Sequence, residues 1–358
     1  RWQALNLNLP PVPVHDLAVK GDDLVIATHG RAFWSLDDIS SLRQLTATVQ
    51  NEPAHLFHPA VAFRARLGAG GFGGASPSEA TIDYWLKSAP AGDLTLEILD
   101  AKGALVRRFT SRSVTRPEPA SGPIGPGAPA SLTKHLGMNR FGWDLRYRPD
   151  RGVPSAVYWQ GSLAGPLVVP GTYQAKLIAD GQTYTAPLVV KEDPRIDVTQ
   201  ADLEQQLALG LQIQQAVDQA HDAINQMNGV RAQLEGLARR LGSAHQDIAA
   251  SAKELGDKVA VVENRLINNN SKAHEDGLNF PIMLANQMVA LQNSLERADR
   301  APTAADSAVY TQLKSQIDEQ LAAWRELQSK DLAALNQLMK RANVPFVSVP
   351  PTPAPASM

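Results

Sequence analysis

The spacing of hydrophobic residues along the chain changes at Asp193-Pro194. Before this point, short apolar runs alternate with polar residues and are separated by turn residues, a pattern typical of β-strands. After it, apolar residues recur every three or four positions, as on one face of an α-helix. A chain of 358 residues is long enough for two or three domains of ~100–200 residues. The sequence therefore predicts a multidomain α+β protein with a β-rich first half and a helical second half.

The helical half begins with a capping box, in which Thr199 is followed three residues later by Asp202. Its apolar spacing predicts a first helix over 200–241, and three further helical stripes follow. Stripes of this heptad-like kind predict a four-helix antiparallel bundle over 196–343. Residues 344–358 are rich in proline, which cannot continue a helix, so we expect a mobile tail there.

Residues 51–195 contain about seven short alternating runs bounded by turn signals such as Asp180-Gly181. Runs of this number and length predict an antiparallel β-sandwich. Trp143 alternates with apolar neighbours on one run, and we expect it in the core. Two stretches rich in proline and glycine, 116–130 and 149–170, are predicted to be long surface loops. The glycine-rich segment 67–74 lacks the features of a phosphate-binding loop and is interpreted as a flexible connection.

Residues 1–50 contain too few strands for a core of their own. The segment 23–38 predicts a strand, a tight turn and a second strand, preceded by a partner strand that ends at Gly21. Two or three strands alone are marginal in water, so we expect them to complete a β structure supplied elsewhere. The chain starts at Arg1 without a methionine, which indicates a processed or truncated protein.

Composition excludes several kinds of chemistry. The absence of cysteine excludes disulfides, thiolate catalysis and cysteine metal sites. A formal charge of −2 gives no general attraction for nucleic acid, and no apolar run approaches the ~18 residues of a membrane span. No metal-binding motif appears either. We therefore expect no cofactor, no metal, no nucleic-acid partner and no membrane span.

Several phrases of the sequence resemble one family. Trp2, the segment 7–10 and the segment 14–38, with its Thr28-x-Gly30-Arg31 turn, resemble the closing blade of sortilin-type or BNR-repeat β-propellers of exported bacterial proteins labelled glycosyl-hydrolase-like. The segments 96–109, 137–147 and 170–190 resemble the immunoglobulin-like or fibronectin-like modules of such proteins, and the segments 276–291 and 298–313 resemble their helical region. This resemblance implies a periplasmic or extracellular location, with the Asp box of the blade and the other blades lying upstream.

The resemblance also divides the chain: 1–50 as closing strands of a propeller blade, 51–195 as an immunoglobulin-like sandwich, 196–343 as the helical bundle and 344–358 as the tail. Within the first part, His29 and Arg31 are candidates for binding an anionic or sugar ligand at a propeller rim, with Trp34 as a stacking surface. A structural turn is the favoured interpretation of the same residues. In the second loop of the sandwich, Tyr158 and Trp159 are candidates for a carbohydrate platform, expected to be better exposed than Trp143.

Two hypotheses for function follow. The favoured one is an accessory, non-catalytic assembly that braces a propeller and mediates protein or glycan contacts, with the upstream blades as partners. The alternative is part of a glycosyl-hydrolase-like enzyme whose catalytic residues lie mainly upstream. A glycosidase needs two carboxyl groups ~5–9 Å apart, whereas Asp37 and Asp38 are adjacent on a strand and face opposite ways. No catalytic residue is assigned, and the sequence does not decide whether the parent protein is an enzyme.

Overall fold

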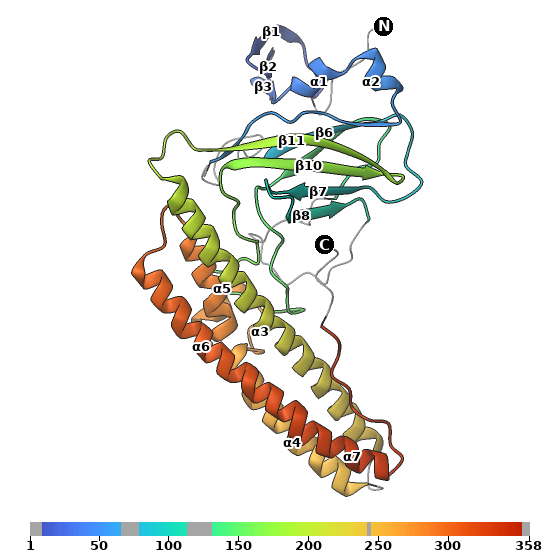
Figure 1. The fold of residues 1–358 in the computed structure, drawn as a ribbon, viewed down its shortest axis with the longest axis vertical. Coiled ribbons are helices and arrows are strands. Elements are labelled where there is room, and N and C mark those ends of the chain that lie inside the picture. Colours follow the sequence, from blue (N-terminus) through green and yellow to red (C-terminus); the bar gives the residue numbers. More distant parts are fainter. Residues whose placement is uncertain (1–8, 66–78, 113–130, 242–244, 353–358) are drawn as a thin grey trace. The chain divides into compact units, whose positions relative to one another are not determined.

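A computed structural model describes residues 9–65, 79–112, 131–241 and 245–352 (Figure 1). The protein is mixed α+β, as predicted, with three β-sheets among the described residues. The chain divides into two compact units. Of the described residues, 9–65, 79–112, 131–145 and 169–196 belong to the β-rich unit, and 146–168, 197–241 and 245–352 belong to the helical unit. The segment 146–168 thus leaves the β-rich part of the sequence and belongs to the helices.

The first sheet is the strand–turn–strand region predicted from the sequence. It is antiparallel, in the order β1 (Val14–Lys20), β2 (Asp23–Thr28), β3 (Phe33–Leu36). Gly21, between β1 and β2, has φ +62°, a conformation that favours glycine. Two short helices that the sequence analysis did not predict follow, α1 (Ser40–Gln44) and α2 (Ala47–Asn51).

The other two sheets contain the strands predicted between residues 80 and 192. One has the order β5-β11-β10-β7-β8 and the other β4-β6-β9. Their bounds are β4 (Ala54–Leu56), β5 (Ala62–Arg64), β6 (Ala80–Leu86), β7 (Thr95–Leu99), β8 (Leu105–Thr110), β9 (Gly137–Trp143), β10 (Gly171–Ala179) and β11 (Gln182–Glu192). The pairing of β5 with β11 is parallel, so the prediction of an entirely antiparallel arrangement is wrong at this edge.

Aromatic rings join these two sheets in one core. Phe109 of β8 lies 4.6 Å from Phe141 of β9, and Trp143 lies 5.7 Å from Tyr173 of β10, measured between ring centroids. Trp143 is fully buried, which confirms its predicted place in the core. Because the alternate residues of each strand point the same way, both sheets contribute a whole face to this core.

Arg140 of β9 ties the end of the first sheet to the core sheets. Its guanidinium binds Asp83 of β6 through two contacts of 2.9 Å and donates to the carbonyl oxygens of Asp37 and Asp38, at 2.7 and 2.5 Å. Asp83 also accepts from the Ser41 hydroxyl at 2.5 Å. The chain that leaves β3 is therefore fixed by a charge-assisted network.

The helical unit is built on α3, which spans Gln200–Leu241 as predicted. Its predicted capping box is present, because Asp202 N donates to Thr199 Oγ1 and Thr199 N donates to Asp202 Oδ2, each at 3.2 Å. Beside α3 lie α4, α5 and α6 (Figure 1). The remaining bounds are α4 (Gln246–Leu266), η1 (His274–Leu278), α5 (Leu284–Leu295), α6 (Ala304–Leu327), η2 (Gln328–Leu332) and α7 (Ala333–Arg341).

Two segments that follow no regular secondary structure are packed against these helices. The predicted surface loop 149–170 is mostly half-buried, and Val153, Tyr158 and Val168 are at most 8% exposed. Residues 344–352 also lie against the helices, with Val347 only 3% exposed, in contrast to the expectation of a mobile tail. The predicted loop 116–130, the glycine-rich segment 67–74 and the last residues of the tail, 353–358, lie outside the described residues.

Candidate functional site

The turn that carries His29, Arg31 and Trp34 is closed by its own hydrogen bonds. The Trp34 indole donates to the Arg31 carbonyl oxygen at 3.0 Å, and Thr28 donates to the Ala32 carbonyl through both its backbone N–H and its hydroxyl. Gly30 has φ +78°, as a turn of this kind requires. The His29 ring stacks on His15 at 5.1 Å. These contacts support the structural interpretation, in which Trp34 uses its one N–H locally.

The acidic residues of the same region also have local partners. Asp23 accepts from the backbone N–H of Asp38 at 3.0 Å, and Asp38 accepts from that of Ser40 at 3.0 Å. Asp37 accepts from the Ser35 hydroxyl at 2.6 Å, and Asp22 pairs with Arg43 at 3.3 Å. Each carboxylate thus stabilises a turn or a strand end, which is the commonest role of aspartate there.

Tyr158 and Trp159 lie in the other unit and do not form an exposed platform. Tyr158 is 8% exposed and its hydroxyl donates to His221 Nε2 at 3.1 Å. Trp159 is half-buried, with its ring 5.1 Å from that of His274. The cavity that both residues line measures about 20 Å³, which is space for about one water molecule. The expectation that Tyr158 is exposed for sugar binding is therefore wrong, because the surrounding loop is packed on the helices.

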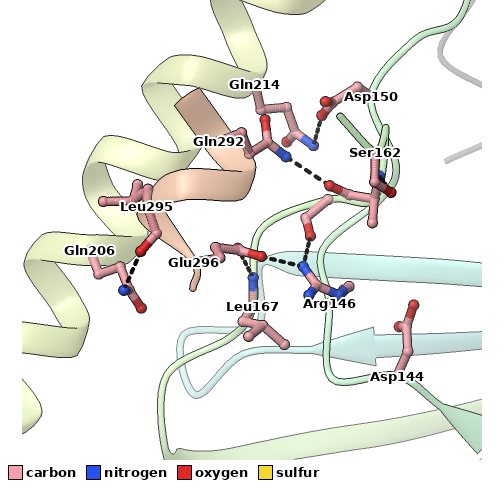
Figure 2. Close-up of polar contacts among 12 residues, drawn as sticks. Asp144, Arg146, Asp150, Ser162, Leu167, Gln206, Gln214, Gln292, Leu295 and Glu296 are labelled. Atoms are coloured by element: carbon pink, nitrogen blue, oxygen red, sulfur yellow. Dashed lines mark hydrogen bonds and ion pairs between the residues drawn. The ribbon is translucent and has the colours of Figure 1, made fainter. Parts of the chain in front are cut away.

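That loop forms the most elaborate polar site of the described residues. We call residues 146–168 the strap. Side-chain amides of α3 and α5 donate to its backbone carbonyls over 2.7–3.0 Å: Gln214 to Arg148, Asn225 to Gly152, Asn286 to Trp159, Asn293 to Gln160 and Gln292 to Ala164. Figure 2 shows part of this arrangement, with Gln214 and Gln292 facing the strap. Buried backbone groups need such partners, and here helix side chains supply them.

Two carboxylates hold the strap to the helices. Glu296 contacts both ends of the strap, because it accepts from Arg146 at 2.6 Å and from the backbone N–H of Leu167 at 2.9 Å, as Figure 2 shows. Nearer its start, Asp218 accepts from the Arg148 guanidinium at 2.5 Å and from the backbone N–H of Arg151 at 2.7 Å. Asp218 is 5% exposed, so these bonds form in a low-dielectric environment, where removing one partner is costly.

His221 of α3 is fully buried and its ring contacts the strap. Its Nδ1 donates to the Arg151 carbonyl at 2.5 Å, so its Nε2 is the acceptor for the Tyr158 hydroxyl. Burial disfavours the charged ring and lowers the pKa of His221 to about 4, although the Arg151 carbonyl and Asp218 oppose this shift. The ring is therefore neutral at neutral pH and acts as a hydrogen-bonded packing element.

Asp150 is the second perturbed group of the strap. It is fully buried and accepts from Gln214 at 3.0 Å. Desolvation raises the pKa of Asp150 well above its ordinary value, and the charge of nearby Asp218 acts in the same direction. Hydrogen bonds from Gln214 and Gln292 and the charge of Arg148 oppose this rise in the pKa of Asp150.

Asp150→Asn is expected to stabilise the helical unit at neutral and alkaline pH. Above an ordinary aspartate pKa of 3.8 the unfolded chain loses a proton that the folded chain keeps, so the wild type loses stability as the pH rises. Asparagine keeps the shape and an N–H donor without this cost. Chemical denaturation followed by helical circular dichroism should give a stabilisation that grows as the pH rises above 3.8. A destabilisation that is constant with pH would contradict a raised pKa of Asp150.

Asp150 of the strap and His221 of α3 are fully buried. Asp222, which pairs with Arg151, also has a pKa raised by burial but is only partly buried. No group of three or more His, Asp or Glu side chains able to hold a metal ion occurs in the described ranges. The sequence analysis missed Gln214, Asp218 and His221, although together with Gln206 and Asn225 they form a stripe along α3 at spacings of three, four or eight residues. A polar stripe of this kind beside an apolar one was the available signal.

Comparison of the chain with protein-family models, with curated proteins and with solved structures finds no match. Among the helices of the described residues, none combines the length and the apolar character needed to cross a bilayer.

Proposed function

We propose that this chain is an accessory, non-catalytic assembly whose first sheet completes a larger β structure and whose remaining parts brace it and make protein contacts. The observation that carries this proposal is an apolar face on β1–β3 that the described residues leave partly exposed. Strand pairing aligns apolar residues in two rows across the sheet. One row is Leu17, Ile26 and Trp34, and the other is Val19, Leu24 and Leu36. Residues that face each other across paired strands share one side of the sheet.

We call these six residues the apolar face: Leu17, Val19, Leu24, Ile26, Trp34 and Leu36. None of the six is buried, and Leu17 and Val19 are 59% and 60% exposed. Fully burying one side chain of this size stabilises a protein by about 1.5–3 kcal/mol. A sheet with such a face gains stability when a second β layer covers it, and contiguous exposed apolar surface marks an interaction site.

A β-propeller supplies a covering layer of this kind, because each blade packs face to face against its neighbours. We therefore infer that β1–β3 are closing strands of a propeller blade, as the resemblance in residues 14–38 implies, in an exported protein. We assign the two core sheets to an immunoglobulin-like sandwich, which the Phe109–Phe141 and Trp143–Tyr173 contacts support. The packing of α3 with α4, α5 and α6 supports the assignment of the helices to a bundle that serves as a brace.

The local partners of Asp22, Asp23, Asp37 and Asp38 favour the accessory role over glycoside hydrolysis by this chain. The proposal would be overturned if the purified 358-residue chain hydrolysed glycosides and this activity persisted after deletion of residues 1–50. A second test, on the apolar face, follows.

Leu17→Asp combined with Val19→Asp is expected to leave the unfolding of the 358-residue chain nearly unchanged, within about 0.5 kcal/mol, because both side chains are exposed. In an assembly that contains the proposed covering layer, the same pair should lower the melting temperature by several degrees, since a charge would face that layer. Ala18→Asp, on the same strand with its side chain on the other face, is the matched control in both cases. An equal response of the chain and the assembly would contradict a covering layer.

A further inference from the structure

The described part of the tail, residues 344–352, lies along the helices in an extended form. The chain turns back after α7 at Asn343, which has φ 57°, and Val344 N donates to the Met339 carbonyl at 2.9 Å. Val347 is 3% exposed whereas its neighbour Phe346 is 72% exposed. Val344, Val347 and Pro350 are all at least half-buried, and their spacing of three residues matches one turn of a polyproline II helix.

Two side-chain amides hold the tail by its backbone. Asn336 donates to the Val347 carbonyl and accepts from the Val347 N–H, both at 2.9 Å. Gln233 donates to the Ser348 carbonyl at 2.8 Å and accepts from the Ser348 N–H at 3.0 Å. Each amide thus supplies the donor and acceptor that a neighbouring β-strand would supply, and it recognises an extended peptide whatever its side chains are.

Gly229 of α3 makes room for Pro350. A Cβ atom at position 229 would lie 2.3 Å from Pro350 Cγ, closer than real Cβ contacts come. Glycine weakens the interior of a helix. The space that Pro350 needs explains why a glycine occurs at position 229 of α3. Gly229 and Gln233 continue, at spacings of four residues, the stripe of α3 in which Gln214, Asp218 and Asn225 contact the strap. One side of α3 therefore contacts both the strap and the tail, and in each case side-chain amides bind backbone groups.

We propose that Gly229, Gln233 and Asn336 form a receptor groove for an extended peptide of the pattern Val-x-x-Val-x-x-Pro, and that the tail occupies this groove in cis. The backbone clamps supply affinity, and the sites of Val347 and Pro350 supply selectivity. The occupant in trans is a partner peptide of the same pattern, which competes with the tail. A hollow of about 730 Å³, lined by Asn336, Lys340 and Phe346 among others, lies beside the clamp and leaves space for ligand side chains that the tail does not fill.

The test uses the full chain with its tail displaced. Val347→Asp places a charge in the buried site and should release the tail. A fluorescently labelled peptide with the wild-type sequence of residues 342–352 should then bind in anisotropy titrations at least about tenfold more tightly than to the wild-type chain, whose groove is filled at a high effective concentration. Phe346→Asp is the matched control, because Phe346 is exposed and its replacement leaves the tail in place.

A second variant tests the groove itself. Gly229→Ala added to Val347→Asp should abolish peptide binding, because the new Cβ occupies the place of Pro350, while the helix propensity of α3 rises. Circular dichroism melting identifies any loss of fold in either variant. The proposal is overturned if the folded Val347→Asp chain binds the peptide no more tightly than the wild type, or if the Gly229→Ala variant retains the affinity. Neither result bears on the apolar face of β1–β3.

Discussion

Asp218→Ala is expected to lower the free energy of unfolding of the helical unit by about 3–5 kcal/mol. The carboxylate is 5% exposed and accepts from both the Arg148 guanidinium and the Arg151 N–H. Alanine leaves a half-buried cation and a backbone donor of the strap without their acceptor, and such groups lose water without compensation. Denaturant unfolding followed by helical circular dichroism measures the change.

Asp318→Ala is the matched control for this variant. Asp318 pairs with Lys314 one helical turn away on α6, at 2.5 Å, and its side chain is 50% exposed. Exposed pairs of this spacing contribute about 0.3–0.5 kcal/mol. If Asp218→Ala cost no more than Asp318→Ala, the strap would not be held to the helices by its buried network.

The stability of the helical unit is expected to fall between about pH 6.5 and pH 4 because of His221, by up to about 3 kcal/mol. Burial lowers the pKa of the folded His221 to about 4, whereas the unfolded histidine has a pKa of 6.5. In this range the unfolded chain binds a proton that the folded chain does not, and the stabilisation present at higher pH is lost as the pH falls. Denaturation curves across this range measure the slope.

His221→Gln should remove this slope. Glutamine retains an N–H for the Arg151 carbonyl and an oxygen for the Tyr158 hydroxyl, but it does not titrate. His274→Gln, at an exposed position of the same unit, controls for loss of a histidine elsewhere. A wild-type slope that persisted in His221→Gln would assign the pH dependence to other groups. Asp150 acts in the opposite sense, since its raised pKa costs stability as the pH rises.

The regular elements were predictable because their signals are local. Alternation and an Asp180-Gly181 turn predict β10 and β11, and the capping box at Thr199 predicts the start of α3. The buried state of the strap was not predictable in this way. Proline and glycine indicate irregular backbone, but they do not tell where its carbonyls find donors. Those donors are Asn and Gln side chains on helices far away in the sequence.

Less of the candidate site than of the fold could be predicted from the sequence. Trp143 was placed correctly because its alternation is local, whereas Tyr158 was expected outside because its neighbours are loop formers. Its burial depends on His221, sixty-three positions further along the chain. The interpretation of Thr28 to Trp34 as a structural turn was supported, since a tight turn is fixed by residues within it.

The fluorescence of a label at position 17 tests whether a second layer covers the apolar face of β1–β3. The chain has no cysteine, so Leu17→Cys gives a single labelling site for a polarity-sensitive fluorophore. We predict solvent-like emission in the 358-residue chain, and a blue shift with lower quencher access in an assembly that contains the proposed covering layer. Identical emission and quenching in the chain and the assembly would contradict the proposed role.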